Sequence, residues 1–331
     1  MTALSEITDR LGRRIDYARI SITDRCNYRC TYCMPESGVD LIPHEGVMRY
    51  EEIMYLCGIL RELGVAKMRF TGGEPLVRRG AVSFLEDVRK NFPDVAISIT
   101  TNGSLLSAFA ERVAALGLAS INVSLDTLEA EKFRAITRIG VVADVTDGIL
   151  SARRAGIPNI KTNTVLIRGF NDREIPDILT FAWENGVTPR LIEFMPLGDD
   201  VWDREKFIGA DEIMAMLSRY GDWQPCASSG GANAAVPMGP AKYYRDSKGR
   251  VAGVIEAVSN HFCEACNRLR ITAEGSMRAC LFASEETPLR DFMKRRDDEG
   301  LKRAIREGID AKPNCWRESR DGRAKMSSIG G

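Results

Sequence analysis

The stretch Cys26–Cys33 reads Cys-Asn-Tyr-Arg-Cys-Thr-Tyr-Cys and places three thiols within eight residues. Just before it, Tyr17–Thr23 alternates apolar and polar residues as a β-strand does. The thiols are therefore expected on a loop at the end of a strand. Three cysteines at Cys-x3-Cys-x2-Cys spacing are difficult to explain by packing, so this loop is the first candidate for chemistry.

Length and composition limit what the chain can be. Its 331 residues fit one large α/β domain or two domains. Basic and acidic residues balance at 46 each, which argues against a dedicated nucleic-acid-binding protein. No apolar run reaches the roughly 20 residues of a membrane helix, and residues 1–10 lack the apolar core of a secretory signal. We therefore expect a cytoplasmic protein.

Nine cysteines gathered mainly at two places favour metal binding or catalysis over a disulfide framework. This interpretation also agrees with a reducing compartment.

Strand and helix patterns alternate regularly along residues 17–194. The predicted strands are Tyr17–Thr23, Lys67–Thr71, Ala96–Thr100, Ser120–Ser124, Ile160–Val165 and Arg190–Phe194. The predicted helices are Tyr50–Leu63, Ala81–Asn91, Leu105–Leu116, Val142–Ala155 and Glu174–Asn185. Such alternation predicts about six βα units with parallel strands and right-handed crossovers. Functional residues are then expected at the C-terminal ends of the strands.

The composition changes after a further helix predicted at Ile208–Tyr220. Residues 224–240 are rich in glycine, proline and small residues and predict a flexible connection. The segments Ala241–Arg245 and Arg250–Val258 then predict a β-hairpin. We therefore divide the chain into residues 1–221 and a C-terminal region of residues 222–331. Its last parts are a helix at Leu301–Gly308 and a polar tail of doubtful order from Lys312.

The first cysteine set allows several interpretations. A structural zinc site needs four protein ligands, and the chain has only two histidines, His44 and His261. A thioredoxin-type redox pair has no use for a third cysteine at this spacing, and incidental thiols stay an alternative. A [4Fe–4S] cluster held by three thiolates would leave one iron open for a chelating small molecule.

A second set has the pattern Cys263-x2-Cys266-x13-Cys280. His261 keeps a Cys3His zinc site open as an alternative. Arg268 and Arg270 alternate as in a strand and should point to the same side. Guanidinium groups suit carboxylate or phosphate, so the pair favours an anionic substrate over a solvated charge pair. The other three cysteines, Cys57, Cys226 and Cys315, are interpreted as ordinary thiols.

Two motifs in order resemble the radical S-adenosylmethionine superfamily. They are the Cys-x3-Cys-x2-Cys loop, with Tyr32 before its last cysteine, and Thr71-Gly-Gly-Glu-Pro75. The resemblance implies that S-adenosylmethionine chelates the open iron and that one electron from the cluster releases a 5′-deoxyadenosyl radical. Gly72 and Gly73 would allow the backbone to approach this ligand.

Five segments resemble one family within it, the GTP 3′,8-cyclases of molybdenum cofactor biosynthesis. They are Arg19–Pro35, Lys67–Leu76, Phe262–Arg270, Cys280–Phe282 and the terminal Gly330-Gly331. The resemblance implies an α/β fold, an incomplete (βα)6 TIM-type barrel, with a C-terminal extension that carries a second [4Fe–4S] cluster. It also implies a lyase that removes H3′ of GTP and joins C3′ to C8. The product would be (8S)-3′,8-cyclo-7,8-dihydroguanosine 5′-triphosphate.

The same resemblance assigns roles to residues. The catalytic set would be Cys26, Cys30 and Cys33 with Arg268 and Arg270, and the iron ligands would be Cys26, Cys30, Cys33, Cys263, Cys266 and Cys280. S-adenosylmethionine would contact Tyr32, Gly73, Ser124 and Met195. GTP would contact Arg19, Arg69, Thr100, Lys161, Arg268, Leu269 and Arg270, and the second open iron would bind the guanine base. The residues themselves add that Arg190, with Arg19, Arg69 and Lys161, could gather positive charge against a triphosphate. The tail Met326–Gly331 would reach into the active site.

The partners implied are GTP, a downstream cyclic pyranopterin monophosphate synthase and a reductant such as flavodoxin or ferredoxin. No nucleic acid or membrane is expected, and a homodimer is compatible with the resemblance.

Two alternatives stay open. A different radical S-adenosylmethionine enzyme, for example one that modifies a peptide, would carry more than three auxiliary cysteines, and only Cys315 remains nearby. An iron or zinc sensor would bind metal without cleaving S-adenosylmethionine.

Overall fold

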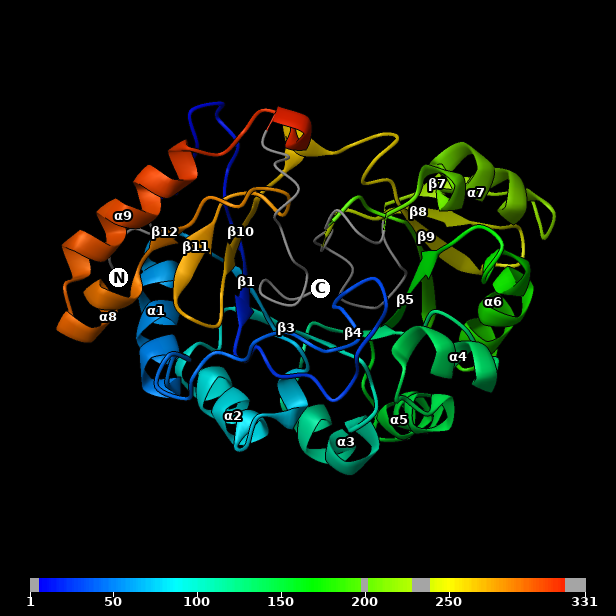
Figure 1. Cartoon of the computed structure of the whole chain (residues 1–331), viewed down its shortest axis with the longest axis horizontal. Helices are drawn as coiled ribbons and strands as arrows, with labels where there is room; N and C mark the ends of the chain where they lie inside the picture. The colour runs from blue at the N-terminus through cyan, green and yellow to red at the C-terminus, as the bar shows by residue number, and fades with distance from the viewer. Residues whose placement is uncertain (1–5, 198–201, 228–238, 319–331) are drawn as a thin grey trace. The chain divides into compact units, whose positions relative to one another are not determined.

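The computed structural model describes residues 6–197, 202–227 and 239–318 (Figure 1). The chain divides into two compact units. The first comprises Met1–Thr100, Leu197–Asp199 and Cys263–Gly331, and the second comprises Thr101–Pro196 and Asp200–Phe262. Most of the predicted connection 224–240 and the whole tail Met326–Gly331 lie outside the described residues.

The first unit begins with parallel strands joined by helices. Its elements are β1 (Tyr17–Ser21), α1 (Tyr50–Glu62), β2 (Lys67–Thr71), α2 (Ala81–Asn91) and β3 (Ala96–Thr101). Strand β2 pairs in parallel with β1 and with β3. Helix α1 buries one apolar face and stops where Gly64 takes a φ of 87°, a conformation that glycine adopts without strain.

The end of the chain completes this first unit. Its elements are β10 (Arg268–Ile271), β11 (Ser276–Arg278), β12 (Thr287–Pro288), α8 (Arg290–Arg295) and α9 (Asp298–Asp310). Strand β10 pairs in parallel with β1, so the strand order is β12-β11-β10-β1-β2-β3. Helices α8 and α9 pack beside α1, as the orange and blue ribbons of Figure 1 show. The strand after the second cysteine pair thus lies next to the strand that leads to the first cysteine loop.

The second unit repeats the βα pattern. Its helices are α3 (Leu106–Ala115), α4 (Ala130–Thr137), α5 (Val142–Arg154), α6 (Ile175–Glu184) and α7 (Ala210–Ser218). Its first strands are β4 (Ser120–Ser124), β5 (Ile160–Leu166) and β6 (Thr188–Glu193), all parallel.

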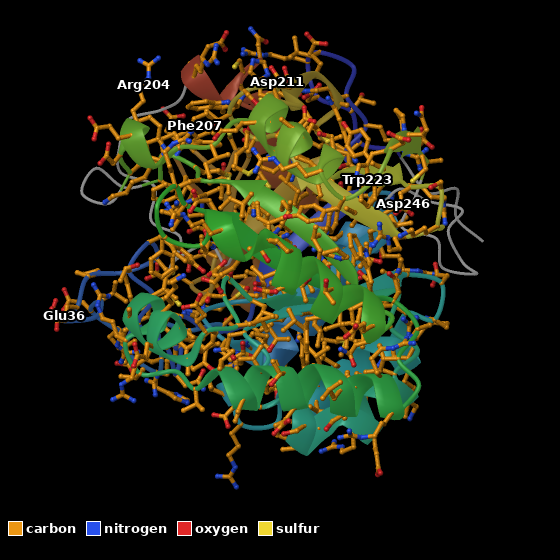
Figure 2. All side chains as sticks on the ribbon, turned by 90° about the vertical axis from the view of Figure 1, so that its right-hand side faces the viewer. Glu36, Arg204, Phe207, Asp211, Trp223 and Asp246 are labelled. Atoms are coloured by element: carbon orange, nitrogen blue, oxygen red, sulfur yellow. The ribbon has the colours of Figure 1, made fainter. Side chains whose placement is uncertain are left out.

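Three further strands extend the sheet in this unit. They are β7 (Gln224–Cys226), β8 (Lys242–Arg245) and β9 (Val251–Ile255). Strand β8 is antiparallel to both β7 and β9 and forms a hairpin with β9, and β9 pairs in parallel with β6. Beside the hairpin, the Trp223 ring stacks on Trp183 at 5.8 Å, and Asp246 accepts a hydrogen bond from Arg250 Nε at 2.7 Å (Figure 2).

The carboxylate of Glu193, at the end of β6, is completely buried and holds the connection after this hairpin. It accepts from the backbone N–H of Ala210 at 2.9 Å, of Val258 at 2.7 Å and of Ser259 at 3.0 Å. A buried carboxylate is stable only with such donors around it.

Most predicted elements are confirmed, including β2, α2 and β4 with their predicted bounds. Helices α4 and α8 and the short strands β7, β11 and β12 were not predicted, because each is too short for a clear hydrophobic period. Strand β7 occupies the first three residues of the predicted flexible connection. Within the described ranges, no helix has the length and apolar character needed to cross a membrane.

Candidate active site

The first cysteine loop follows β1, as predicted. The Cys33 N–H donates to Cys30 O at 2.9 Å, and the Tyr28 N–H donates to Cys26 Sγ at 3.4 Å. Burial, together with the nearby Cys26 thiol, raises the pKa of Cys33 to about 12. Neighbouring buried thiols of this kind lose their protons when a metal binds. The donor set therefore fits an iron–sulfur cluster.

The Thr71–Pro75 motif is joined to this loop by backbone hydrogen bonds. The Gly73 N–H donates to Thr23 O at 2.9 Å, and the Glu74 N–H donates to Arg25 O at 2.8 Å. A Cβ atom on Gly73 would lie 2.4 Å from Arg25 O, so the glycine is required by the close approach of two backbones. The two predicted S-adenosylmethionine contacts in this unit, Tyr32 and Gly73, thus lie on loops that are joined to each other.

Three arginines form a row across neighbouring strands. In the register of the sheet, Arg19 of β1 is paired with Arg270 of β10 on one side and with Arg69 of β2 on the other. Residues paired in this way point to the same face of a sheet. Arg69 and Arg270 are buried, and the Arg69 guanidinium donates to Tyr17 Oη at 2.6 Å and to Ile99 O at 2.7 Å.

The row carries concentrated positive charge. Burial lowers the pKa of Arg270 well below its usual range, and the charges of Arg19 and Arg268 lower it further. Burial alone would raise the pKa of Tyr17, but Arg69 and Arg19 lower it to about 8. We define these three residues, Arg19, Arg69 and Arg270, as the arginine row. Its chemistry favours a bound anion with several negative oxygens.

Two other predicted nucleotide contacts lie near the row. Thr100, next to Ile99 on β3, has a buried Oγ1 without a hydrogen-bond partner among the residues that the structure describes. Leu269 alternates with Arg268 and Arg270, so its buried side chain faces the opposite side of the sheet.

The second cysteine set lies at the other end of the same strands. Cys263 and Cys266 precede β10, and Cys280 follows the antiparallel strand β11. Burial would raise the pKa of Cys266, but Arg268 and Lys312 lower it to about 6, and Arg268 Nη2 lies 3.6 Å from its Sγ. The thiolate is the form that binds metals. Cys266 is therefore prepared as a ligand.

The arginine row lies between the two cysteine sets. The first set follows the C-terminal end of β1, whereas the second set is at the N-terminal end of the paired strand β10. A five-residue strand spans about 16 Å. A nucleotide-sized anion on this face could therefore reach from one set toward the other.

Several residues around the second set were not found from the sequence. Arg13 Nη1 donates to Cys263 O at 2.9 Å, and Lys312 Nζ donates to Arg268 O at 2.8 Å. Cys315, interpreted from the sequence as an ordinary thiol, lies with His261 and Cys263 in a group whose possible ligand atoms are all within 4.8 Å of one another. Only folding brings Arg13 to this place, so no local sequence signal could have found it.

The remaining predicted site residues belong to the second unit. Ser124 of β4, Asn163 of β5 and Arg190 of β6 share one register level. Lys161 points to the same face of β5 as Asn163, and its Nζ lies 5.5 Å from the centre of the Tyr243 ring. This face of the strands in the second unit is therefore polar and positively charged.

The second unit also supplies two packing details. A Cβ at Gly253 would lie 2.8 Å from Cγ of Arg190, so this glycine leaves room for the arginine. Met195 follows β6 and packs on Ile192 and Ile255. Its position as a S-adenosylmethionine contact stays a prediction.

Fold and cysteine loops together define a radical S-adenosylmethionine protein. Residues 20–182 match the family described as "Radical SAM superfamily", and residues 187–317 match "Molybdenum Cofactor Synthesis C". A solved structure of Streptococcus suis SuiB bound to its precursor peptide superposes with a TM-score of 0.58 at 11% identity. It covers 91% of this chain and 71% of that one. A second solved structure of Streptococcus suis SuiB superposes with a TM-score of 0.53 at 14% identity and covers 63% of this chain and 47% of that one. The predicted α/β fold class, with parallel strands and a distinct C-terminal region, is confirmed.

Curated relatives narrow the class. The chain is 41% identical over 328 residues to the GTP 3′,8-cyclase of Thermodesulfovibrio yellowstonii, covering 98% of this chain and 99% of that protein. It is 42% identical over 313 residues to the GTP 3′,8-cyclase of Listeria monocytogenes, covering 93% and 91%. This chain belongs to the GTP 3′,8-cyclase family of radical S-adenosylmethionine enzymes. Its cofactors accordingly include S-adenosylmethionine and a [4Fe–4S] cluster.

Proposed function

We propose that the chain is a lyase that converts GTP to (8S)-3′,8-cyclo-7,8-dihydroguanosine 5′-triphosphate in molybdenum cofactor biosynthesis. The relatives that it matches over nearly their whole length carry the name GTP 3′,8-cyclase. The observation that carries the proposal is the arginine row, which lies between two three-cysteine sets on one pair of strands. A triphosphate is the kind of anion that three guanidinium groups can hold.

The first cysteine set would hold the cluster that binds S-adenosylmethionine, and these groups supply a 5′-deoxyadenosyl radical when bound. The chain itself orients the two motifs. Backbone hydrogen bonds from the N–H groups of Gly73 and Glu74 hold the cysteine loop against the second motif, Thr71–Pro75. We propose Tyr32, Gly73, Ser124 and Met195 as contacts of S-adenosylmethionine.

We propose that the second cysteine set holds a second [4Fe–4S] cluster that positions the substrate. The lowered pKa of Cys266 supports this role, because a thiolate is already present at neutral pH. The proposed nucleotide contacts are Arg19, Arg69, Thr100, Lys161, Arg268, Leu269 and Arg270, of which Leu269 would use its backbone because its side chain faces the other side of the sheet. Holding C3′ near the radical source and guanine near the second cluster lowers the entropic part of the barrier.

Several wider statements belong to the same proposal. Residues 1–221 would form the radical S-adenosylmethionine domain, and residues 222–331 would carry the second cluster and further substrate-binding residues. The chain would work in the cytoplasm with flavodoxin or ferredoxin as reductant, and a cyclic pyranopterin monophosphate synthase would consume its product.

GTP deuterated at C3′ tests the reaction. Under anaerobic conditions with reductant and S-adenosylmethionine, the deuterium should appear in 5′-deoxyadenosine, as measured by mass spectrometry. Guanosine triphosphate deuterated at C8 serves as the control, because that position is not the source of the abstracted atom. If deuterium from C3′ stays in the nucleotide, the proposed reaction is wrong.

Iron content and two arginine variants test the assignment of the second set. Reconstituted protein should hold about eight irons if each set carries a four-iron cluster. Arg268→Ala and Arg270→Ala should lose GTP turnover and keep this iron. The matched control Arg303→Ala removes an exposed arginine of α9 and should keep both. Iron loss in the first two variants would mean that the arginines are structural.

A further inference from the structure

The segment Lys312–Trp316, which follows α9, is fastened across the second cysteine set. Arg13 bridges the two, because its Nη1 donates to Cys263 O at 2.9 Å and its Nη2 donates to Pro313 O at 3.0 Å. Lys312 Nζ donates to the carbonyl oxygens of Arg268 and Ala279, which flank the set. We call residues Lys312–Trp316 the clasp.

The end of the clasp is held equally firmly. The Trp316 ring is buried and stacks on Phe282 with centroids 4.5 Å apart. The backbone N–H of Trp316 also donates a hydrogen bond to the Cys263 thiol. Cys315 directly precedes Trp316 in the chain, so it lies beside a ligand of the proposed cluster.

The position of Cys315 gives the second set a fourth thiol. Its Sγ and that of Cys263 lie within 4.8 Å of each other. A [4Fe–4S] cluster is ordinarily held by four thiolates.

We propose that Cys315 is the fourth thiolate ligand of the second cluster when no nucleotide is bound, and that the substrate displaces it. The inference rests on the proposed function in so far as the second set holds a cluster. The exchange would change no oxidation state: the bond from Cys315 Sγ to one iron would break and a donor atom of the purine would take its place. The released thiolate would take up a proton from the buffered solvent.

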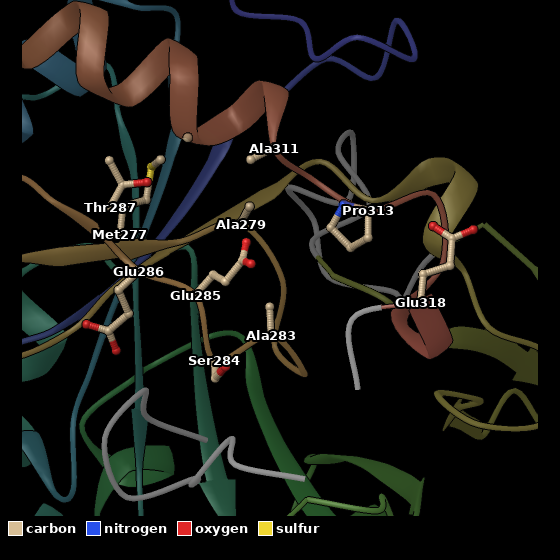
Figure 3. Close-up of a pocket in the computed structure, with 11 residues that line it drawn as sticks. Met277, Ala279, Ala283, Ser284, Glu285, Glu286, Thr287, Ala311, Pro313 and Glu318 are labelled. Atoms are coloured by element: carbon tan, nitrogen blue, oxygen red, sulfur yellow. The ribbon is translucent and has the colours of Figure 1, made fainter. Parts of the chain in front are cut away.

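Displacement needs space for the clasp to yield. A cavity of about 730 Å³ lies beside it and is lined by Ala311, Pro313 and Glu318 on one side and by Ala279 and Ser284 on another (Figure 3). The clasp is therefore fastened at Lys312 and Trp316 and borders the cavity at Pro313. A protected iron would also be shielded from water until substrate arrives.

His261 is the competing ligand, because it belongs to the same group as Cys263 and Cys315. One general rule and one observation favour Cys315 over His261 as the ligand. Iron–sulfur clusters take thiolates far more often than imidazole. In addition, Arg13, Lys312 and Trp316 each bind the clasp to the cysteine set.

The test uses the full-length chain with Cys26→Ala, Cys30→Ala and Cys33→Ala, so that the second cluster is the one observed. The protein is reconstituted anaerobically, reduced in ¹⁷O-enriched water and measured by electron–nuclear double resonance without nucleotide. With Cys315 present, no ¹⁷O coupling to the cluster is expected. Adding Cys315→Ala or Cys315→Ser should produce a ¹⁷O coupling, because water or hydroxide can then reach the iron.

Nucleotide binding gives a second readout. Removing a competing internal ligand raises the fraction of binding-competent protein, so Cys315→Ala should lower the Kd for GTP by about tenfold. The matched control Cys226→Ala removes a cysteine from β7 and should change neither spectrum nor Kd.

Four outcomes would overturn the proposal. They are a ¹⁷O coupling already present with Cys315, no coupling in either Cys315 variant, a coupling produced by His261→Ala alone, and zinc instead of iron in the second set. The first three outcomes are independent of the proposed function, because the nucleotide-free spectrum needs no turnover, whereas zinc in the second set would overturn the proposed second cluster as well. Failure of deuterium transfer would refute the reaction and leave the ligand result standing.

Discussion

Gly73→Ala is the sharpest test of how the two motifs of the first site are joined. The new Cβ would lie 2.4 Å from Arg25 O, whereas Cβ atoms essentially never approach other heavy atoms below 3.0 Å. The two backbones must therefore separate by at least 0.6 Å, the difference between these values. The atom that must move is the acceptor of the 2.8 Å hydrogen bond from Glu74 N–H.

The cost can be estimated from these two effects. Overpacking of a rigid site costs about 1–3 kcal/mol, and weakening one hydrogen bond adds about 0.5–1.5 kcal/mol. We expect the free energy of unfolding to fall by roughly 2–4 kcal/mol. Because the displaced carbonyl precedes Cys26, iron should also be lost from the first set and the affinity for S-adenosylmethionine should fall.

The assay is anaerobic urea denaturation followed by circular dichroism, together with iron analysis and equilibrium binding of S-adenosylmethionine. Gly58→Ala is the control, because its Cβ would meet nothing within 4 Å and it lies in α1. That change should stabilise the protein by up to about 1 kcal/mol, since alanine is the better helix former. If Gly73→Ala left stability within about 0.5 kcal/mol of the native value and kept all iron, the argument from close backbone approach would be wrong.

Three further predictions concern other buried groups. Arg270→Met removes a buried charge that Arg19 repels, so it should raise the free energy of unfolding by about 1–4 kcal/mol while GTP binding weakens at least tenfold. Denaturation measures the stability and calorimetry measures the binding. A fall in stability would contradict the prediction. The pKa of Tyr17 is lowered to about 8 from an ordinary 10, so its ionisation should stabilise the native state increasingly as the pH rises from 8 to 10. This stabilisation should be lost as the pH falls through 8. Ultraviolet titration should show a tyrosinate near pH 8 that Tyr17→Phe abolishes. Glu193→Gln should cost about 2–3 kcal/mol, because one amide cannot accept from all the donors around the carboxylate, and a loss no larger than that of exposed Glu205→Gln would contradict it.

Much of the fold was predictable because local rules and tertiary structure agree. The apolar spacing of Tyr50–Leu63 and the glycine after it predict α1 to within one residue at its end. The short patterns at Lys67–Thr71 and Ser120–Ser124 are buried strands, as their β-branched and aromatic residues indicate. Helix α4 was missed because eight residues contain too few turns for a clear period.

The cysteine spacing and the order of the motifs were sufficient to identify the superfamily and the family. These signals are local, because a loop that binds a cluster needs its ligands at fixed intervals along the chain. The alternation of Arg268 and Arg270 likewise predicted their common direction from strand geometry alone.

Other features depend on contacts between residues that are far apart in the sequence, and only the tertiary structure decides them. Parallel pairing of β10 with β1 aligns Arg270 with Arg19 across about 250 positions and sets the two cysteine loops at opposite ends of the strands. Arg13 meets the clasp by the same folding. Strand register is set by packing and not by sequence proximity, so Cys315 looks like an ordinary thiol in the sequence and lies beside Cys263 in the structure.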